Sequence, residues 1–164
     1  MVEKKEFCSL LSNSSSRGRG EEMELSLEGF KDYVQNRDFQ EKTKQYKKLI
    51  ETLEPYINEG NVKYFYPYNL FNENEKKFFL FAGNYFVVVT LQEDGKIFVK
   101  NTFLKPDTIS LEIPPHPSEG LILCFKNELG EEIVFNSLKD SNAIWNVDYI
   151  ELITKIYKYL TEYR

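Results

Sequence analysis

At Gly60 the spacing of apolar residues changes from a helical pattern to the alternating pattern of β-strands. This change constrains the fold more than any other feature of the sequence. After it, short runs of β-branched and aromatic residues alternate with turn residues, which is typical of antiparallel sheets. Asp94-Gly95, between two such runs, predicts a tight hairpin, and Asn127–Gly130 predicts a second. We expect strands over 62–68, 76–82, 84–91, 96–104, 107–113, 120–127 and 131–136.

Two helices are expected before the strands, in a helical segment over 25–58. The first has apolar side chains at helical spacing from Leu25 onward. Asp38 and Glu41 form a capping box that opens the second helix, expected over 38–57. This second helix is apolar on one side and rich in lysine on the other, so it should pack through one face.

The C-terminal segment 147–163 has the clearest helical pattern in the chain. Its apolar stripe comprises Ile150, Ile153, Tyr157 and Leu160. The helix is expected to begin either at Asp148, in a capping box with Glu151, or at Asn146, the competing cap. An amphipathic helix of this kind should cap the core formed by the strands.

The chain of 164 residues is long enough for one domain. Residues 1–22 include a Ser/Gly/Arg-rich stretch of linker composition, so they are expected to form a flexible tail. Met23 is an alternative first residue of the native protein. The remainder, 23–164, is expected to be a single α+β domain.

Seven antiparallel strands followed by one amphipathic helix is the element order of the pleckstrin-homology-like superfold. The stretch from about Val62 to Leu160 resembles that superfold in strand count, hairpin spacing and the closing helix around Ile153. The resemblance implies a seven-stranded antiparallel barrel or sandwich, to which the segment 25–58 is an addition. Small bacterial proteins of unknown function share this appearance. The abundance of Lys, Asn, Phe, Tyr and Ile favours a low-GC Gram-positive bacterium, or one of its phages or mobile elements, as the source.

Composition excludes several classes of function. The net charge of −5 argues against nucleic-acid binding, and no apolar run approaches the length of a membrane span. Two cysteines, Cys8 and Cys124, and one histidine, His116, are too few for a metal cage. His116 is expected to be an incidental surface residue, and Cys124, in an apolar strand, a small buried one. No catalytic or cofactor-binding motif is present, so we expect no enzyme, cofactor or metal, and a reduced, cytoplasmic protein.

Aromatic residues crowd into the segment 64–86. Strand alternation makes both faces of its strands apolar, and both faces therefore need cover. One face should line the core. The other is either covered by the helix over 38–57 or left for a partner.

We expect a partner surface where the first strand runs into the following loop. Its members are Tyr66, Tyr68 and Phe71, with Glu73 and Glu75 as an acidic rim. Apolar anchors inside a polar rim are typical of protein interfaces, and the acidic rim suits a basic partner.

The sequence therefore predicts a non-catalytic cytoplasmic protein-interaction module. The alternative is an acidic inhibitor or immunity-type protein from a phage or a toxin or defence locus, because negative charge steers such proteins onto basic enzymes. A phosphoinositide binder is disfavoured because Glu73 and Glu75 offset the lysines Lys76 and Lys77. A hydrolase using carboxylates alone would need a close pair of acids, and the sequence shows none at a fixed spacing. The oligomeric state is left open.

Overall fold

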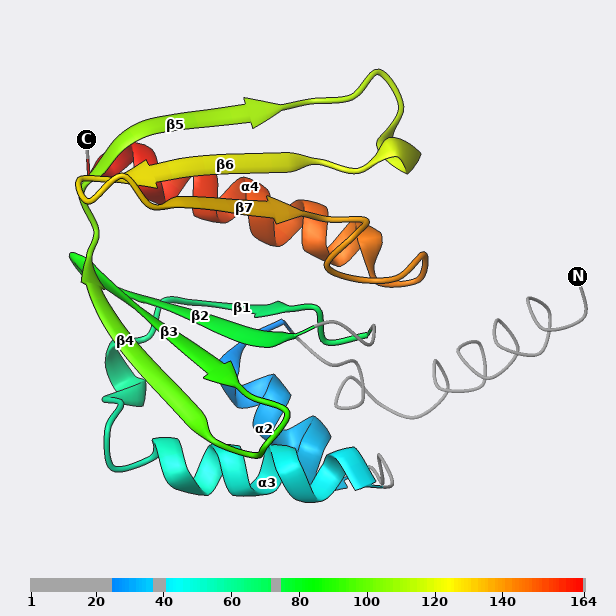
Figure 1. Cartoon of the computed structure of the whole chain (residues 1–164). Coiled ribbons are helices and arrows are strands. Elements are labelled where there is room, and N and C mark those ends of the chain that lie inside the picture. The colour runs from blue at the N-terminus through cyan, green and yellow to red at the C-terminus, as the bar shows by residue number, and fades with distance from the viewer. Residues whose placement is uncertain (1–24, 37–40, 72–74, 164) are drawn as a thin grey trace, which may run out of the picture.

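Seven antiparallel strands form two separate sheets in the computed structural model, which describes residues 25–36, 41–71 and 75–163 (Figure 1). The first sheet has the order β1-β2-β3-β4 and the second the order β5-β6-β7. The strands are β1 (Tyr64–Tyr68), β2 (Lys76–Ala82), β3 (Tyr85–Leu91), β4 (Ile97–Phe103), β5 (Pro106–Glu112), β6 (Ile122–Asn127) and β7 (Glu132–Asn136). The helices are α2 (Leu27–Asn36), α3 (Glu41–Leu53) and α4 (Asn146–Glu162), with 3-10 turns at Glu59–Asn61 and Pro117–Glu119.

The predicted α+β class is confirmed, and each predicted strand occurs within a few residues of its expected position. The hairpin at Asp94-Gly95 is also confirmed. The Gln92 amide donates to the Lys96 carbonyl at 2.9 Å, and Gly95 has a φ of 81°, a conformation that favours glycine.

Helices cover the first sheet on the face away from the second sheet (Figure 1). Phe65, Phe78 and Leu80 point to this face and are buried against side chains of α2 and α3. Phe30 of α2 packs on Phe65 and Phe78 with ring centroids 5.3 Å away in each case. Of the two alternatives expected for this face, cover by the helix over 38–57 is therefore the one that the structure supports, and α3 (Glu41–Leu53) provides it together with α2.

The opposite face of the first sheet packs against the second sheet and α4. Its buried aromatic side chains meet Phe125 and Phe135 of the second sheet. Ile153 and Ile156 of α4 are fully buried in the same core. The hydroxyl of Tyr159 donates to the Gly83 carbonyl and thereby joins the helix to the β2–β3 turn. The C-terminal helix therefore caps the core, as predicted.

The helix α4 begins at Asn146, one of the two expected start positions, but neither Asn146 nor Asp148 is its N-cap residue. Trp145 precedes the helix, and Asp148 lies in its first turn. The Asn142 side chain instead accepts hydrogen bonds from the backbone amides of Ile144 and Trp145, while Asn146 accepts one from the hydroxyl of Ser137 at 2.7 Å. Both interactions depend on the preceding loop, which local sequence patterns do not describe.

Among the described residues, no strand of one sheet pairs with a strand of the other. The seven strands therefore do not form a closed barrel. The expected tail 1–22, Met23 and the Asp38 cap lie outside the described residues. No helix in the described ranges has the length and hydrophobicity needed to cross a membrane.

Candidate functional site

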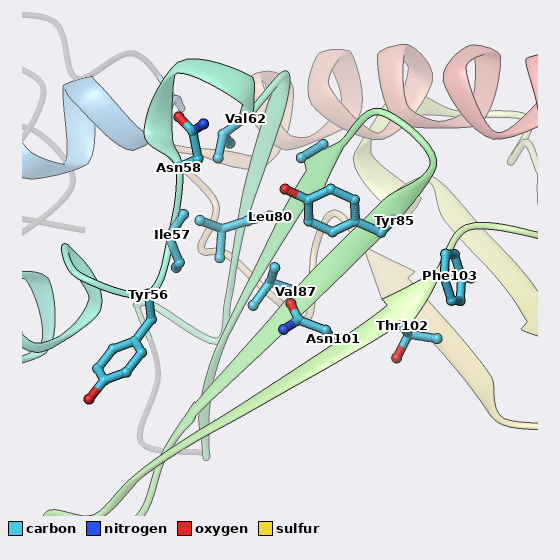
Figure 2. A pocket seen from close by; sticks show the side chains of 11 residues that line it. Tyr56, Ile57, Asn58, Val62, Leu80, Tyr85, Val87, Asn101, Thr102 and Phe103 are labelled. Atoms are coloured by element: carbon cyan, nitrogen blue, oxygen red, sulfur yellow. The ribbon is translucent and has the colours of Figure 1, made fainter.

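A pocket of about 340 Å³ lies on the helix-covered side of the first sheet, near its β4 edge (Figure 2). It is bounded by the chain between α3 and β1 and by the ends of β2, β3 and β4. Its lining consists of Tyr56, Ile57, Asn58, Val62, Leu80, Ala82, Tyr85, Val87, Asn101, Thr102 and Phe103. Ligand pockets commonly have volumes of about 300–1,000 Å³, so this one is at the small end of that range.

The helices cover the start of β4 but not its end, because Ile97 packs against the cluster that includes α2 and α3, whereas Asn101 and Phe103 on the same face are exposed. After Leu53 the chain continues through a 3-10 turn at Glu59–Asn61, and an ion pair between Lys31 of α2 and Glu59 anchors this turn. Buried side chains of β2 and β3, including Leu80 and Val87, contribute to the lining. The helices therefore leave part of the first sheet open beside β4.

Two aromatic residues of the pocket lining are largely exposed. Tyr56 is 74% exposed and Phe103 is 77% exposed, although each lines an apolar cavity. Exposed aromatic residues beside a concave apolar surface are typical anchors of protein interfaces. This combination is the strongest indication of a binding site in the described part of the chain.

The lining of the pocket is polar in part but carries no formal charge. The polar groups are the amides of Asn58 and Asn101 and the hydroxyls of tyrosine and threonine side chains. The lining contains no Asp, Glu, Lys, Arg or His side chain. The pocket therefore suits an apolar or uncharged polar group.

Thr102 contributes to the lining but not through its hydroxyl. It pairs with Phe86 across the sheet, and alternation along β4 places its side chain on the face opposite to that of Asn101. Its Oγ1 atom is buried and has no hydrogen-bond partner among the described residues. We therefore expect this hydroxyl to cost stability rather than to bind a ligand in the pocket.

Only some residues of the predicted partner surface are accessible in the structure. Tyr66 is 0% exposed and stacks on Phe135, with ring centroids 3.9 Å apart. The placement of Tyr66 on a partner surface was therefore wrong, because α4 and the second sheet cover its face of β1. Tyr68 and Phe71 are half-buried, and Glu75 is exposed. Glu73 lies outside the described residues.

Phe71 stacks on Trp145, at a centroid distance of 5.3 Å and an interplanar angle of 10°. Trp145 precedes α4, where Ile144 and Val147 are exposed apolar residues. We call Phe71, Ile144, Trp145 and Val147 the α4-start patch. Sequence reasoning found its Phe71 member but not the three residues more than 70 positions further along the chain.

The charges beside this patch largely offset one another. Glu75 forms an ion pair with Lys77 at 3.0 Å. Lys76 donates from its Nζ to the carbonyl of Asn69 at 2.7 Å. Both lysines therefore make polar contacts within their own segment of the chain.

A carboxyl group is buried directly beneath the predicted surface. The hydroxyl of Tyr66 donates to Asp140 Oδ2 at 2.5 Å, and the backbone amide of Asn136 donates to the same oxygen at 2.7 Å. Burial raises the pKa of Asp140 from 3.8 to about 6, although both hydrogen bonds favour the charged form. Asp140 joins β1 to the loop before α4 and does not line the pocket, so its role is structural.

His116 and Cys124 lie apart from both surfaces. His116 is exposed in the loop between β5 and β6, as predicted. The expectation that Cys124 is buried was wrong. Its side chain is half-buried because it faces away from the core on β6, and partial burial raises the pKa of its thiol. No cluster of three or more His, Cys, Asp or Glu side chains in the described ranges could hold a metal ion.

Sequence reasoning missed the pocket. A usable signal was the placement of Val99, Asn101 and Phe103 at alternate positions of one strand, since these residues share one face. The sequence does not show which part of this face the helices cover.

Comparison with curated proteins found no match, and neither did comparison with solved structures. The model of a protein family described as "Protein of unknown function (DUF3908)" matches residues 27–151. The match begins at the first residue of α2, includes both sheets and ends in the first turns of α4, so it covers the pocket and most of the fold. The chain therefore belongs to the DUF3908 family.

Proposed function

We propose that this protein is a non-catalytic protein-interaction module that binds its partner through the pocket beside β4. The observation that carries the proposal is the pair of exposed aromatic residues, Tyr56 and Phe103, at an apolar pocket. Each can bury a large area on contact with a partner. Since no charged side chain lines the pocket, an apolar group can enter without leaving a buried charge unpaired.

The net charge of the chain indicates a further property of the partner. The chain carries a formal charge of −5, which favours encounter with a protein that is basic around its contact surface. This attraction acts over a distance and increases the association rate, while the neutral pocket selects the group that enters it. The partner we propose is therefore basic overall and presents an apolar side chain.

A capture experiment with matched variants tests the proposal. The double variant Tyr56→Ser, Phe103→Ser removes both aromatic anchors of the pocket. The control Ile113→Ser, Leu129→Ser removes two side chains of similar exposure, 74% and 77%, elsewhere on the surface. Exposed substitutions usually change stability by less than about 0.5 kcal/mol, so both proteins should stay folded.

Each tagged protein is expressed in the native host and its partners are quantified by mass spectrometry. A partner retained by the control and lost from the double variant is the result we expect. Equal recovery with both variants would remove the pocket from the proposal.

The α4-start patch is a second candidate surface for the same function. Val147 is exposed two residues after Trp145, whose ring stacks on that of Phe71, so an apolar side chain and a flat aromatic surface both occur at the start of α4. Val147→Asp changes this patch without altering a buried residue. A partner lost with Val147→Asp and retained with the pocket variant would transfer the binding role to the patch.

A cytoplasmic location is part of the proposal. Cys124 is a free, half-buried thiol on the outer face of the second sheet, which suits a reducing compartment. Fractionation of the native host tests this location. Recovery of the protein outside the cytoplasm would exclude it.

We also propose that the fold is an open member of the pleckstrin-homology-like superfold. Four strands, three strands and a C-terminal helix in that order support this assignment. An experimental structure that superposes on such domains over both sheets and α4 is the expected outcome. A structure in which α4 packs outside the two sheets would contradict it.

A further inference from the structure

We propose that the partner binds as an extended segment, which adds a fifth strand to the first sheet at β4 and places an apolar side chain in the pocket. This inference rests on the proposed function and specifies how the same site is used. Its basis is that Asn101 and Phe103 of β4 line the pocket and also lie on an edge strand, where backbone groups can pair with another strand.

β4 is an edge strand whose outer side has no partner strand in the described part of the chain. Hydrogen bonds to β3 involve its even-numbered residues, because the Gln92 amide donates to Lys96 and the Leu104 amide donates to Asn84. In an antiparallel pair the backbone groups of successive residues point to opposite sides. The N–H and C=O groups of Val99, Asn101 and Phe103 therefore point outward.

The side chains of these three residues share one face of the sheet. Val99, Asn101 and Phe103 pair with β3 residues that pack on the helix-covered side, among them Val87. Asn101 and Phe103 line the pocket. A strand paired with β4 would thus place alternate side chains on the pocket side of the sheet, and the residue opposite Asn101 would lie closest to the pocket.

Exposed sheet edges usually carry features that prevent further pairing. β1 contains Pro67, β5 has Pro106 and a register shift at its start, and β7 has five residues beginning with Glu132. β4 is seven residues long and pairs with β3 without a register shift. It also exposes Phe98 (61%) and Phe103. β4 is therefore the edge best suited to accept another strand.

The pocket lining determines the chemistry of the segment. A charged side chain facing the pocket would lose water and find no opposite charge, whereas an aliphatic or aromatic one would bury apolar surface. Alternate residues of the segment would lie on the other face, near the exposed ring of Phe98. We therefore expect a segment that is apolar at alternate positions and free of proline.

A second copy of the chain fits this edge less well. A two-fold pair of β4 strands centred on Val99, Lys100 or Asn101 would bring Lys100, which forms an ion pair with Glu131, opposite or diagonal to its own copy. Each copy would also add a charge of −5. The occupant we assign is accordingly a segment of a different protein.

Peptides from a random display library, each about 12 residues long, supply a defined probe. They are selected on the full chain, and the tightest binder is added to ¹⁵N-labelled protein for amide hydrogen exchange by NMR. The expected result is slower exchange at Val99, Asn101 and Phe103. The amides of Lys100 and Thr102 should change little, because they already bond to β3.

Two variants separate backbone pairing from side-chain contact. Val99→Pro removes an outward N–H that makes no bond within the sheet, and Val99→Ala shortens the side chain but keeps that N–H. We expect the peptide to bind at least about tenfold more weakly to the proline variant, equivalent to about 1.4 kcal/mol, and within about threefold of the wild type to the alanine variant. Thermal melting confirms that both variants fold, and the exchange pattern of the wild type gives a result even if the proline variant does not fold.

Several results would overturn strand addition. These are unchanged exchange at the three outward amides, equal binding to both variants, a library that yields no binder, or a dimer of the chain that dissociates with Val99→Pro. If the host partner is lost with Tyr56→Ser, Phe103→Ser but kept with Val99→Pro, the proposed function stands and strand addition fails. If the pocket double variant keeps the partner, the proposed function itself fails.

Discussion

Replacing Asp140 with asparagine should change how stability depends on pH. The carboxyl is 2% exposed, and burial raises its pKa from 3.8 to about 6. Between these values the folded protein binds a proton that the unfolded chain releases, so the contribution of Asp140 to stability falls as the pH rises from about 4 through 6. At about 1.4 kcal/mol per pH unit, the total change is about 3 kcal/mol.

Asp140→Asn keeps an oxygen that can accept from Tyr66 and removes the titration. The free energy of unfolding is measured by urea denaturation at several values between about pH 3.5 and 7.5, with the fluorescence of Trp145, the single tryptophan, as the probe. The stability of the variant minus that of the wild type should rise by about 3 kcal/mol across this range. The subtraction cancels the titration of groups that the two proteins share.

A difference that stays constant with pH would refute this reasoning, because the folded pKa would then equal that of the unfolded chain. A difference that falls as the pH rises would show that the hydrogen bonds from Tyr66 and Asn136 outweigh burial. Tyr66→Phe gives a further check. Loss of its hydroxyl should raise the pKa of Asp140 beyond the wild-type value, since one donor to the charged form is removed.

Three substitutions test the packing. Ile153→Asp places a charge at a fully buried position of α4 and should cost more than about 4 kcal/mol, so circular dichroism should show an unfolded chain. Gly120→Ala would place a Cβ 2.9 Å from Leu138 Cβ at a φ of +83°, whereas Gly95→Ala meets nothing within 4 Å at +81°. Gly120→Ala should therefore lower the melting temperature more than Gly95→Ala does. An equal decrease in both variants would show that backbone strain alone causes the effect. Thr102→Val removes a buried hydroxyl that has no hydrogen-bond partner, so it should stabilise the protein by about 1 kcal/mol, measured by urea denaturation. A decrease in stability would show that the hydroxyl does form a hydrogen bond.

The strands were predictable because their signals are local. Alternation of side chains and turn residues such as Gly95 locate a strand without knowledge of what it packs on. The start of α4 was less accessible. It depends on hydrogen bonds to Asn142 and between Asn146 and Ser137, which form only when the loop folds back on β7.

The burial of Tyr66 could not be predicted from its neighbours in sequence. Its hydroxyl needs an acceptor when buried, and Asp140, which provides one, is 74 residues away. The pocket has a similar origin. It depends on which part of β4 the helices cover, and a hydrophobic pattern gives the length of a helix but not the part of a sheet that it leaves open.

Site-specific photo-cross-linking at position 103 tests the central claim most directly. Phe103 is replaced by p-benzoyl-phenylalanine, an aromatic residue of similar character, and Leu129, of equal exposure at 77%, is replaced in the control. After irradiation of the native host, cross-linked species are identified by mass spectrometry. Binding at the pocket beside β4 predicts one discrete protein cross-linked from position 103 and absent from position 129, and it predicts that Val99→Pro removes this product. The same products from both positions, or none from position 103, would contradict the account.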